Sequence, residues 1–185
     1  MERCAWATKS VQLCVYHDLE WGVPVEDDQA LFECLSLELF QAGLNWQLIL
    51  KRRPALKAAL AAFDVDVLAA FTEVDQMMYL TTPTVIRNRR KLAAVIHNAR
   101  VWQAQQLAGV SPATTLWRLQ RQVGLDTPRL VTVVCTQFKE WGLQGLGQKA
   151  TRSFLQASGF INDHDHQCFR RQEIFLSSHT TGRIS

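Results

Sequence analysis

The sequence lacks a long apolar segment. No run approaches the roughly 18 apolar residues that a membrane-spanning helix requires, and the chain opens with charge, Met1-Glu2-Arg3-Cys4, where a secretory signal would place an apolar core. These absences disfavour a membrane protein and an exported one. We therefore expect a cytoplasmic protein that makes no contact with a membrane.

Signs of disorder, of a repeat array and of a β-sheet are also missing. Hydrophobic residues make up 48% of the 185 residues, which is enough for a sizeable core. There is no low-complexity tract, no repeat of solenoid period and no convincing alternating strand. A single domain over residues 1–185 is the simplest organisation.

Cysteine is scarce and odd in number, with five residues at positions 4, 14, 34, 135 and 168. We do not expect a disulfide framework in such a chain without an export signal, so metal ligation and plain burial remain. The net charge of +3 permits a polyanionic partner without requiring one.

Apolar residues recur at helical spacing, which predicts an all-α fold. We expect a helix after Asp27, two short helices capped by Asp64 and Thr72, and one that Ser111-Pro112 begins and that reaches Val123. Further helices are predicted over residues 46–53, 54–63 with Pro54 in the first turn, 86–107 before Gly109, 128–141 and 149–158. The polar tail, residues 177–185, is expected to fray.

Cysteine and histidine pairs stand near both ends of the chain: Cys4 with His17, and His164 with Cys168. Two thiolates with two imidazoles are a common donor set for tetrahedral zinc. A spacing of four lets the second pair face one ion across a helical turn or a tight loop. Four protein donors leave no place for a reactive water, so a bound ion would be structural.

Ordinary burial of the cysteines, with solvated histidines, explains the same pattern. His166 is a spare donor that could replace either neighbour, although only His164 follows Asn162-Asp163, whose side chains can orient its ring. A shared ion would tie residues 1–20 to residues 159–170 and so stabilise the fold directly.

Several motifs agree in order and spacing with one family. They are RCAW at 3–6, YHDLEWGVP at 16–24, LFECLSLELFQAGLNW at 31–46, IRNRRK at 86–91 and SFLQASGFINDH at 153–164. The sequence resembles the DNA-3-methyladenine glycosylase I family over the first 100 residues and the C-terminal segment, and less clearly over residues 101–142.

The resemblance implies a helix-hairpin-helix DNA glycosylase fold, with a structural Zn²⁺ held by Cys4, His17, His164 and Cys168. It also implies a monofunctional hydrolase that flips cationic 3-methyladenine out of double-stranded, alkylated DNA and excises it without strand cleavage. A monomer is the simplest state for an enzyme that scans DNA. The family's base-binding residues map onto Tyr16, Glu38, Trp46 and Ser153, and Glu38 is the catalytic candidate.

These residues suit a charged base. Stacking on Trp46 would supply a cation–π attraction of about 0.5–2 kcal/mol, and Glu38 a charge-assisted hydrogen bond. Tyr16 and Ser153 would contact the base edge. Taken singly, Glu38 is more often a solvated carboxylate, and Trp46 and Tyr16 are more often core aromatics.

For DNA binding we expect a hairpin at residues 81–85, whose backbone amides face phosphate. The basic candidates are Arg87, Arg89 and Lys91, with Lys149 near a later helix start, although such runs are also common solvated faces. Thr84 stands where the family usually has glycine, and a β-branched residue does not readily adopt a left-handed backbone. Other departures, at Leu39, Phe40, Asn45, Gln148, Lys149 and Arg152, predict altered DNA affinity or a narrower pocket.

Two other functions fit part of the pattern. A diverged protein could bind damaged DNA without cleaving the glycosidic bond, as the substitutions at Thr84 and around Arg152 suggest. A zinc-dependent hydrolase would need an exchangeable water on the metal, which four protein ligands would exclude.

Overall fold

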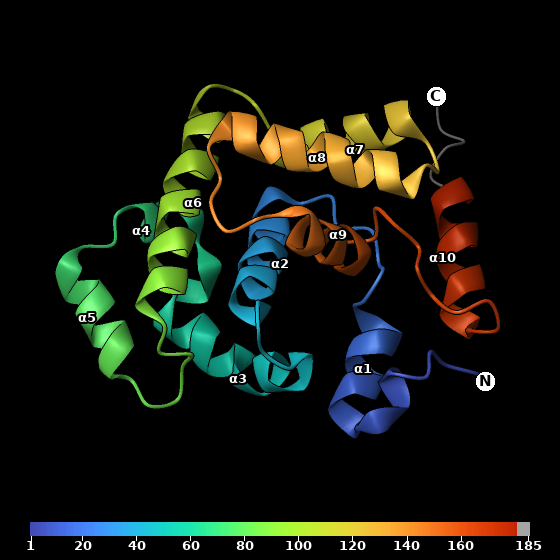
Figure 1. The fold of residues 1–185 in the computed structure, drawn as a ribbon, viewed down its shortest axis with the longest axis horizontal. Helices are drawn as coiled ribbons and strands as arrows, with labels where there is room; N and C mark the ends of the chain where they lie inside the picture. Colours follow the sequence, from blue (N-terminus) through green and yellow to red (C-terminus); the bar gives the residue numbers. More distant parts are fainter. Residues whose placement is uncertain (181–185) are drawn as a thin grey trace. The chain divides into compact units, whose positions relative to one another are not determined.

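The computed structural model describes the backbone of residues 1–180 and the side chains of residues 1–174. The first half contains η1 (Ala7–Lys9), α1 (Val11–Leu19), α2 (Asp28–Gln41), α3 (Trp46–Ala59), η2 (Ala61–Phe63), α4 (Val65–Ala69) and α5 (Glu73–Thr81). The second half contains α6 (Arg89–Leu107), α7 (Pro112–Val123), α8 (Thr127–Trp141), α9 (Gln148–Ala157) and α10 (Phe169–Thr180) (Figure 1). No strand occurs within residues 1–180, and the predicted all-α fold is confirmed.

The chain forms two compact units. The first combines Met1–Pro24 with the chain from Leu155 onward, and the second is Val25–Phe154. The first unit is therefore discontinuous in sequence and brings the two ends of the chain together, as predicted. None of the described helices has both the length and the apolar character needed to cross a membrane.

Helix α2 forms the centre of the second unit. It packs against α3, η2, α6 and α7, while α4 lies on α6 and α7 pairs with α8. Leu31, Phe32, Leu35 and Phe40 of α2 are fully buried, and Phe32 meets Trp102 of α6 with ring centroids 5.6 Å apart. The helix that carries Glu38 is thus held on several sides.

Side-chain caps define most of the predicted helix starts. The carboxylate of Asp27 accepts from the Ala30 amide at 2.8 Å, and that of Asp64 accepts from the Val67 amide at 3.0 Å. Thr72 and Asp75 form the predicted capping box, and Ser111 caps α7 through the Thr114 amide at 3.1 Å. These caps satisfy amides that the first helical turn leaves without partners.

The predicted break at Pro54 is wrong. Helix α3 runs through Pro54 to Ala59, because buried side chains before and after it, Ile49, Leu50 and Leu56, hold both parts of the helix against the unit's core. The chain then makes a left-handed turn, with φ between 48° and 62° at Ala61, Ala62 and Phe63. Gln29 supports this turn by donating to the Phe63 carbonyl at 2.6 Å.

The start of α6 and two whole helices also differ from prediction. Helix α6 begins at Arg89, three residues later than expected, because the Asn88 side chain caps it through the Lys91 amide at 3.1 Å. Helices α1 and α10 were not predicted. Helix α10 includes residues 177–180 of the expected frayed tail, and residues 181–185 lie outside the described part of the chain.

Candidate functional site

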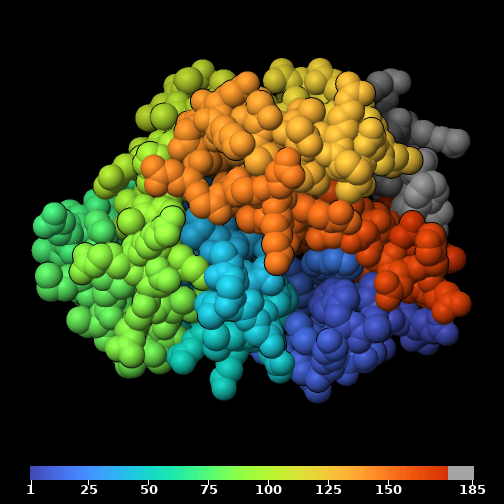
Figure 2. All heavy atoms as spheres, in the orientation of Figure 1, coloured from blue at the N-terminus to red at the C-terminus, as the bar shows by residue number. Residues whose placement is uncertain are grey.

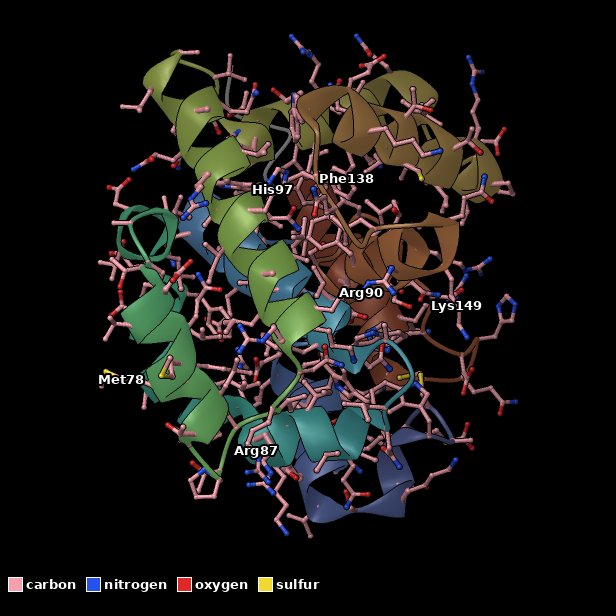
Figure 3. All side chains as sticks on the ribbon, turned by 60° about the vertical axis from the view of Figure 1, so that its left-hand side comes forward. Met78, Arg87, Arg90, His97, Phe138 and Lys149 are labelled. Atoms are coloured by element: carbon pink, nitrogen blue, oxygen red, sulfur yellow. The ribbon has the colours of Figure 1, made fainter. Side chains whose placement is uncertain are left out.

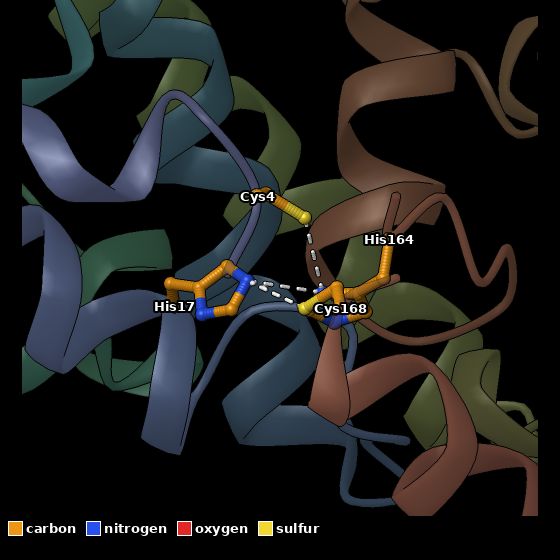
Figure 4. Close-up of side chains that lie close together, drawn as sticks. All are labelled: Cys4, His17, His164 and Cys168. Atoms are coloured by element: carbon orange, nitrogen blue, oxygen red, sulfur yellow. Dashed lines mark hydrogen bonds between the residues drawn. The ribbon is translucent and has the colours of Figure 1, made fainter. Parts of the chain in front are cut away.

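Cys4, His17, His164 and Cys168 form a buried cluster within the first unit, here called the Cys/His cluster (Figure 4). Cys4 precedes η1, His17 lies in the last turn of α1, His164 lies in the loop after α9, and Cys168 immediately precedes α10. The four side chains are at most 2% exposed. The predicted pairing of the chain ends is confirmed, and the C-terminal pair meets across a loop.

The ligand atoms all lie within 4.8 Å of one another, and the separations that involve His17 with His164 or Cys168, and His164 with either cysteine, are close to the edges of a tetrahedral site. His17 Nε2 lies 3.2 Å from His164 Nδ1 and 3.3 Å from Cys168 Sγ. His164 Nδ1 lies 3.5 Å from each cysteine sulfur. Bond lengths of about 2.0–2.1 Å to nitrogen and about 2.3 Å to sulfur give tetrahedral edges of about 3.3–3.8 Å. The donor set therefore fits a four-coordinate ion such as zinc.

Each histidine has one ring nitrogen held outside the cluster. Nδ1 of His17 lies 2.8 Å from Oδ1 of Asp18, and Nε2 of His164 lies 3.2 Å from the Trp21 carbonyl oxygen. Both outer partners accept hydrogen bonds, so the lone pair of each ring falls on the nitrogen that faces the cluster. The Asp165 amide donates to the Cys4 sulfur at 3.2 Å, which favours a thiolate there.

Burial raises the pKa of the Cys4 thiol to about 12 and lowers the pKa of His164 to about 4, with the charge of His17 adding to the second effect. The neutral imidazole is the ligand form. A thiolate in this position needs a cation to compensate its charge, as a coordinating metal does.

Two tryptophan rings pack against the histidines of the cluster. The Trp6 ring meets His17 edge-on at 5.3 Å between centroids, and Trp21 meets His164 in the same way at 4.5 Å. Gly22 allows this close approach, because a Cβ at its position would lie 2.9 Å from His164 Nε2.

The spare donor predicted at His166 is exposed and lies outside the cluster. Asn162 donates to the Arg171 carbonyl at 3.0 Å, and Asp163 accepts from Gln156. The Trp21 carbonyl therefore orients the His164 ring, a contact that the sequence did not indicate because 143 residues separate the two.

Glu38 lies on α2 of the second unit. Its side chain is buried, as are those of Leu37 and Leu39 on either side, and its Oε2 atom has no hydrogen-bond partner. Burial raises the pKa of the Glu38 carboxyl to about 8. The group is therefore mostly protonated at neutral pH, and a cation beside it would favour the ionised form.

The other base-binding candidates lie on separate elements. Trp46 is the half-buried first residue of α3, and Asn45 caps that helix through the Gln47 amide at 2.8 Å. Ser153 is half-buried on α9, in the part of that helix that belongs to the second unit. Tyr16 is buried in the first unit, on α1 beside His17.

The hairpin predicted for DNA binding joins α5 to α6. Helix α5 ends at Thr81, one residue into the predicted 81–85 span, and the connection reaches Asn88. The Tyr79 hydroxyl donates to the Ile86 carbonyl at 3.0 Å, and Arg52 of α3 donates to the Thr84 carbonyl at 2.8 Å. Thr84 is not among the non-glycine residues with positive φ.

The basic candidates differ in their environments. Arg87 in the hairpin and Lys149 in the first turn of α9 are exposed (Figure 3), as is Arg89 at the start of α6. Figure 2 shows the segment from α5 to the start of α6, in green, at the surface. Lys91 is half-buried, and its ammonium donates to the carbonyls of Phe40 and Ala42, both at 2.6 Å.

Sequence reasoning missed the residues that support the site. Asp18 and Trp21 orient the two histidines, and Lys91 caps the end of the helix that carries Glu38. The adjacency of His17 and Asp18 was a usable signal for the first. The others depend on contacts between residues distant in sequence.

The family model described as Methyladenine glycosylase matches residues 6–171, which run through both units. This match covers most of the chain, and the chain belongs to the methyladenine glycosylase family. Among curated relatives it is 35% identical over 179 residues to DNA-3-methyladenine glycosylase 1 of Escherichia coli (strain K12), covering 91% of this chain and 96% of that protein. It is 31% identical over 177 residues to DNA-3-methyladenine glycosylase of Haemophilus influenzae (strain ATCC 51907 / DSM 11121 / KW20 / Rd), covering 90% and 96%.

Solved structures agree in fold. A crystal structure of 3-methyladenine DNA glycosylase I superposes with a TM-score of 0.84 at 35% identity, covering 91% of this chain and 98% of that chain. The enzyme from Staphylococcus aureus, whose structure addresses 3-methyladenine recognition, gives a TM-score of 0.82 at 30% identity and covers 92% and 97%.

Proposed function

We propose that this chain is a DNA glycosylase that hydrolyses the N-glycosidic bond of 3-methyladenine in alkylated DNA and leaves an abasic site. Membership of the methyladenine glycosylase family, with relatives of that activity at 31–35% identity, supports the reaction class. The single structural observation that carries the proposal is the buried, partly unsatisfied carboxyl of Glu38.

An apolar site that holds one carboxyl group distinguishes a cationic base from a neutral one. Methylation at N3 leaves adenine positively charged while it is still bound to the sugar. Ionised Glu38 would attract that cation strongly, since charges interact more strongly where water is excluded. Unmodified adenine carries no such charge and would gain little from the ionised carboxylate.

The same charge makes the base a good leaving group. Cleavage releases a neutral base while positive charge passes to the sugar, so little protonation is required from the protein. Glu38 would contribute electrostatic stabilisation of that charge, and a water molecule would complete the hydrolysis. The enzyme must first extrude the nucleotide, at a cost of a few kcal/mol.

Trp46 and Ser153 are proposed to contact the base with Glu38, Trp46 by stacking on its face and Ser153 at its edge. Family resemblance also assigns base binding to Tyr16. For DNA we propose phosphate contacts from the exposed side chains of Arg87, Arg89 and Lys149 and from the hairpin around Thr84. Both compact units would act in one glycosylase domain.

We propose zinc as the ion of the Cys/His cluster. The tetrahedral spacing and the Cys₂His₂ donor set support this choice. Bound there, the ion would tie both chain ends within the first unit. Four protein ligands would leave it no water to activate, so the zinc-dependent hydrolase considered from the sequence has no support.

The test is release of free 3-methyladenine from methylated duplex DNA by the purified protein. We expect Glu38→Gln to lower the rate by at least about 100-fold, as for loss of a group that stabilises transition-state charge. Glu33→Gln is the matched control, because Glu33 lies on the same helix and pairs instead with Arg53 and Lys57, at 2.8 and 2.9 Å.

Glu33→Gln should retain the wild-type rate. A folded wild-type protein that binds methylated duplex normally and releases no base would overturn the enzyme assignment. That result would identify a damaged-DNA-binding protein of the same family.

A further inference from the structure

The chain neighbours of the four cluster residues contact one another as well. Arg3 precedes Cys4, Asp18 follows His17, Asp165 follows His164, and Phe169 follows Cys168. The guanidinium of Arg3 donates through Nε to both carboxylate oxygens of Asp18, at 2.9 Å each. The same guanidinium lies over the Phe169 ring, 5.7 Å from its centroid. Three of the four segments that supply the cluster thus meet at one arginine.

Asp18 connects Arg3 to a cluster residue directly. Its Oδ1 lies 2.8 Å from Nδ1 of His17, and its Oδ2 lies 3.8 Å from the sulfur of Cys14, one turn earlier on α1. A carboxylate only accepts hydrogen bonds, so His17 must carry its proton on Nδ1. The lone pair then lies on Nε2, which points toward His164 and Cys168.

The fourth segment is joined separately. The Asp165 carboxylate accepts from the Ala5 amide at 3.2 Å, and the Asp165 amide donates to the Cys4 sulfur at the same distance. The Phe169 amide donates to the Glu2 carbonyl at 3.0 Å. The backbone of residues 2–5 is therefore fixed to the C-terminal segment on either side of Cys4, without any ion.

We propose that Arg3 and Asp18 form a brace around the Cys/His cluster that holds His17 in its ligating tautomer and position and thereby sets the affinity for the metal. The inference rests on the proposed zinc site. Asp18 is a positioning residue that acts through His17, and Arg3 acts through Asp18. Support of this kind for a ligating histidine typically contributes about 10–100-fold to metal affinity.

The experiment measures the dissociation constant for Zn²⁺ of the full-length protein by competition with a chromophoric chelator. We expect Asp18→Ala to weaken binding about 10–100-fold. Asp18→Asn retains an oxygen that can accept from His17 and should lose less. Arg3→Met should weaken binding less than Asp18→Ala, and the double variant should bind no more weakly than Asp18→Ala alone, because both residues act along one path.

Glu33→Gln is the control, since it breaks an ion pair in the second unit and leaves the brace intact. The absorption spectrum of the Co²⁺-loaded protein gives a second readout, because its ligand-field bands change when His17 is poorly held and would not respond to a general loss of stability. If Asp18→Ala does not fold, Asp18→Asn and Arg3→Met provide the same measurement.

Zn²⁺ affinities of all brace variants within twofold of wild type, with unchanged Co²⁺ spectra, would overturn the brace and leave the metal site standing. A loss of Zn²⁺ affinity in Glu33→Gln as large as that in the brace variants would also overturn the brace. Wild-type protein that binds no Zn²⁺ would overturn the metal site itself, and the brace with it.

Discussion

Glu38 is an acid placed among apolar side chains, and its burial costs folding free energy that depends on pH. The pKa of its carboxyl is about 8 in the folded protein, against 4.5 for the ordinary group. Below pH 4.5 both states are protonated and the cost is absent. As the pH rises toward 8, ionisation increasingly favours the unfolded chain, so the protein loses stability over this window.

Glu38→Gln should remove this pH dependence. We expect the free energy of unfolding of the variant, relative to wild type, to rise between about pH 4.5 and pH 8 by a few kcal/mol, with about 5 kcal/mol as an upper bound. Urea unfolding of both proteins at about pH 5 and about pH 8.5 measures the difference. Equal differences at the two pH values would show that Glu38 ionises freely in the folded protein.

Individual residues were predictable to different degrees. The four cluster residues followed from donor chemistry and from the family resemblance, because donor type is visible in a sequence. The burial of Glu38 and the orientation of His164 by Trp21 were not predictable from composition or spacing. Both depend on which distant segments pack around them.

Helices whose ends are fixed by local chemistry were predicted well. The caps at Asp27, Asp64, Thr72 and Ser111 lie where the sequence placed them. Helix α1 was missed because it exposes Val11, Val15 and Leu19 while it buries Leu13, Tyr16 and His17. The polar residue His17 thus takes a core position, while apolar residues of the helix face solvent. The spacing of the apolar residues therefore does not mark the buried face of α1.

Lys91 of α6 donates from its ammonium to the Phe40 carbonyl in the last turn of α2 and to the Ala42 carbonyl in the loop that leads to Trp46. It therefore joins α6 to the end of α2. Cations are favoured at helix C-termini, and charge-assisted hydrogen bonds contribute about 1.5–3 kcal/mol. We expect Lys91→Met to lower the free energy of unfolding by about 1–3 kcal/mol and to leave the salt dependence of DNA binding unchanged.

Arg87→Gln is the variant to compare with Lys91→Met in DNA binding. It should reduce the slope of log Kd for DNA against log salt concentration by about one. Urea unfolding and DNA titrations at several salt concentrations measure both effects. A reduced slope in Lys91→Met would show that Lys91 contacts a DNA phosphate, as the sequence predicted.

The whole molecule depends on the pairing of its two ends. Residues 1–24 contribute two of the cluster residues and the chain after Leu155 contributes the other two. Neither segment alone could hold the ion with four ligands. The stability of the first unit should therefore follow the metal, because an ion that binds only the folded state stabilises it by mass action.

Removal of the metal with a chelator should lower Tm by about 8–16 °C, if the free ion had been at about 1,000 times its Kd. Hydrogen exchange should accelerate in residues 4–22 and 155–174 more than around α2 and α6. Readdition of Zn²⁺ should restore both values. Uniform acceleration across both units would show that the ion stabilises the chain as one cooperative block.

The ribosome makes Cys4 early and Cys168 late. During synthesis, the first pair of donors leaves the ribosome long before the second pair exists, so a metal ion can gain all four ligands only after residue 168 has been made. Until then Cys4 and His17 are an incomplete chelate, accessible to oxidants and to competing metals. A stall before residue 168 therefore leaves Cys4 and His17 without the other two donors of the Cys/His cluster.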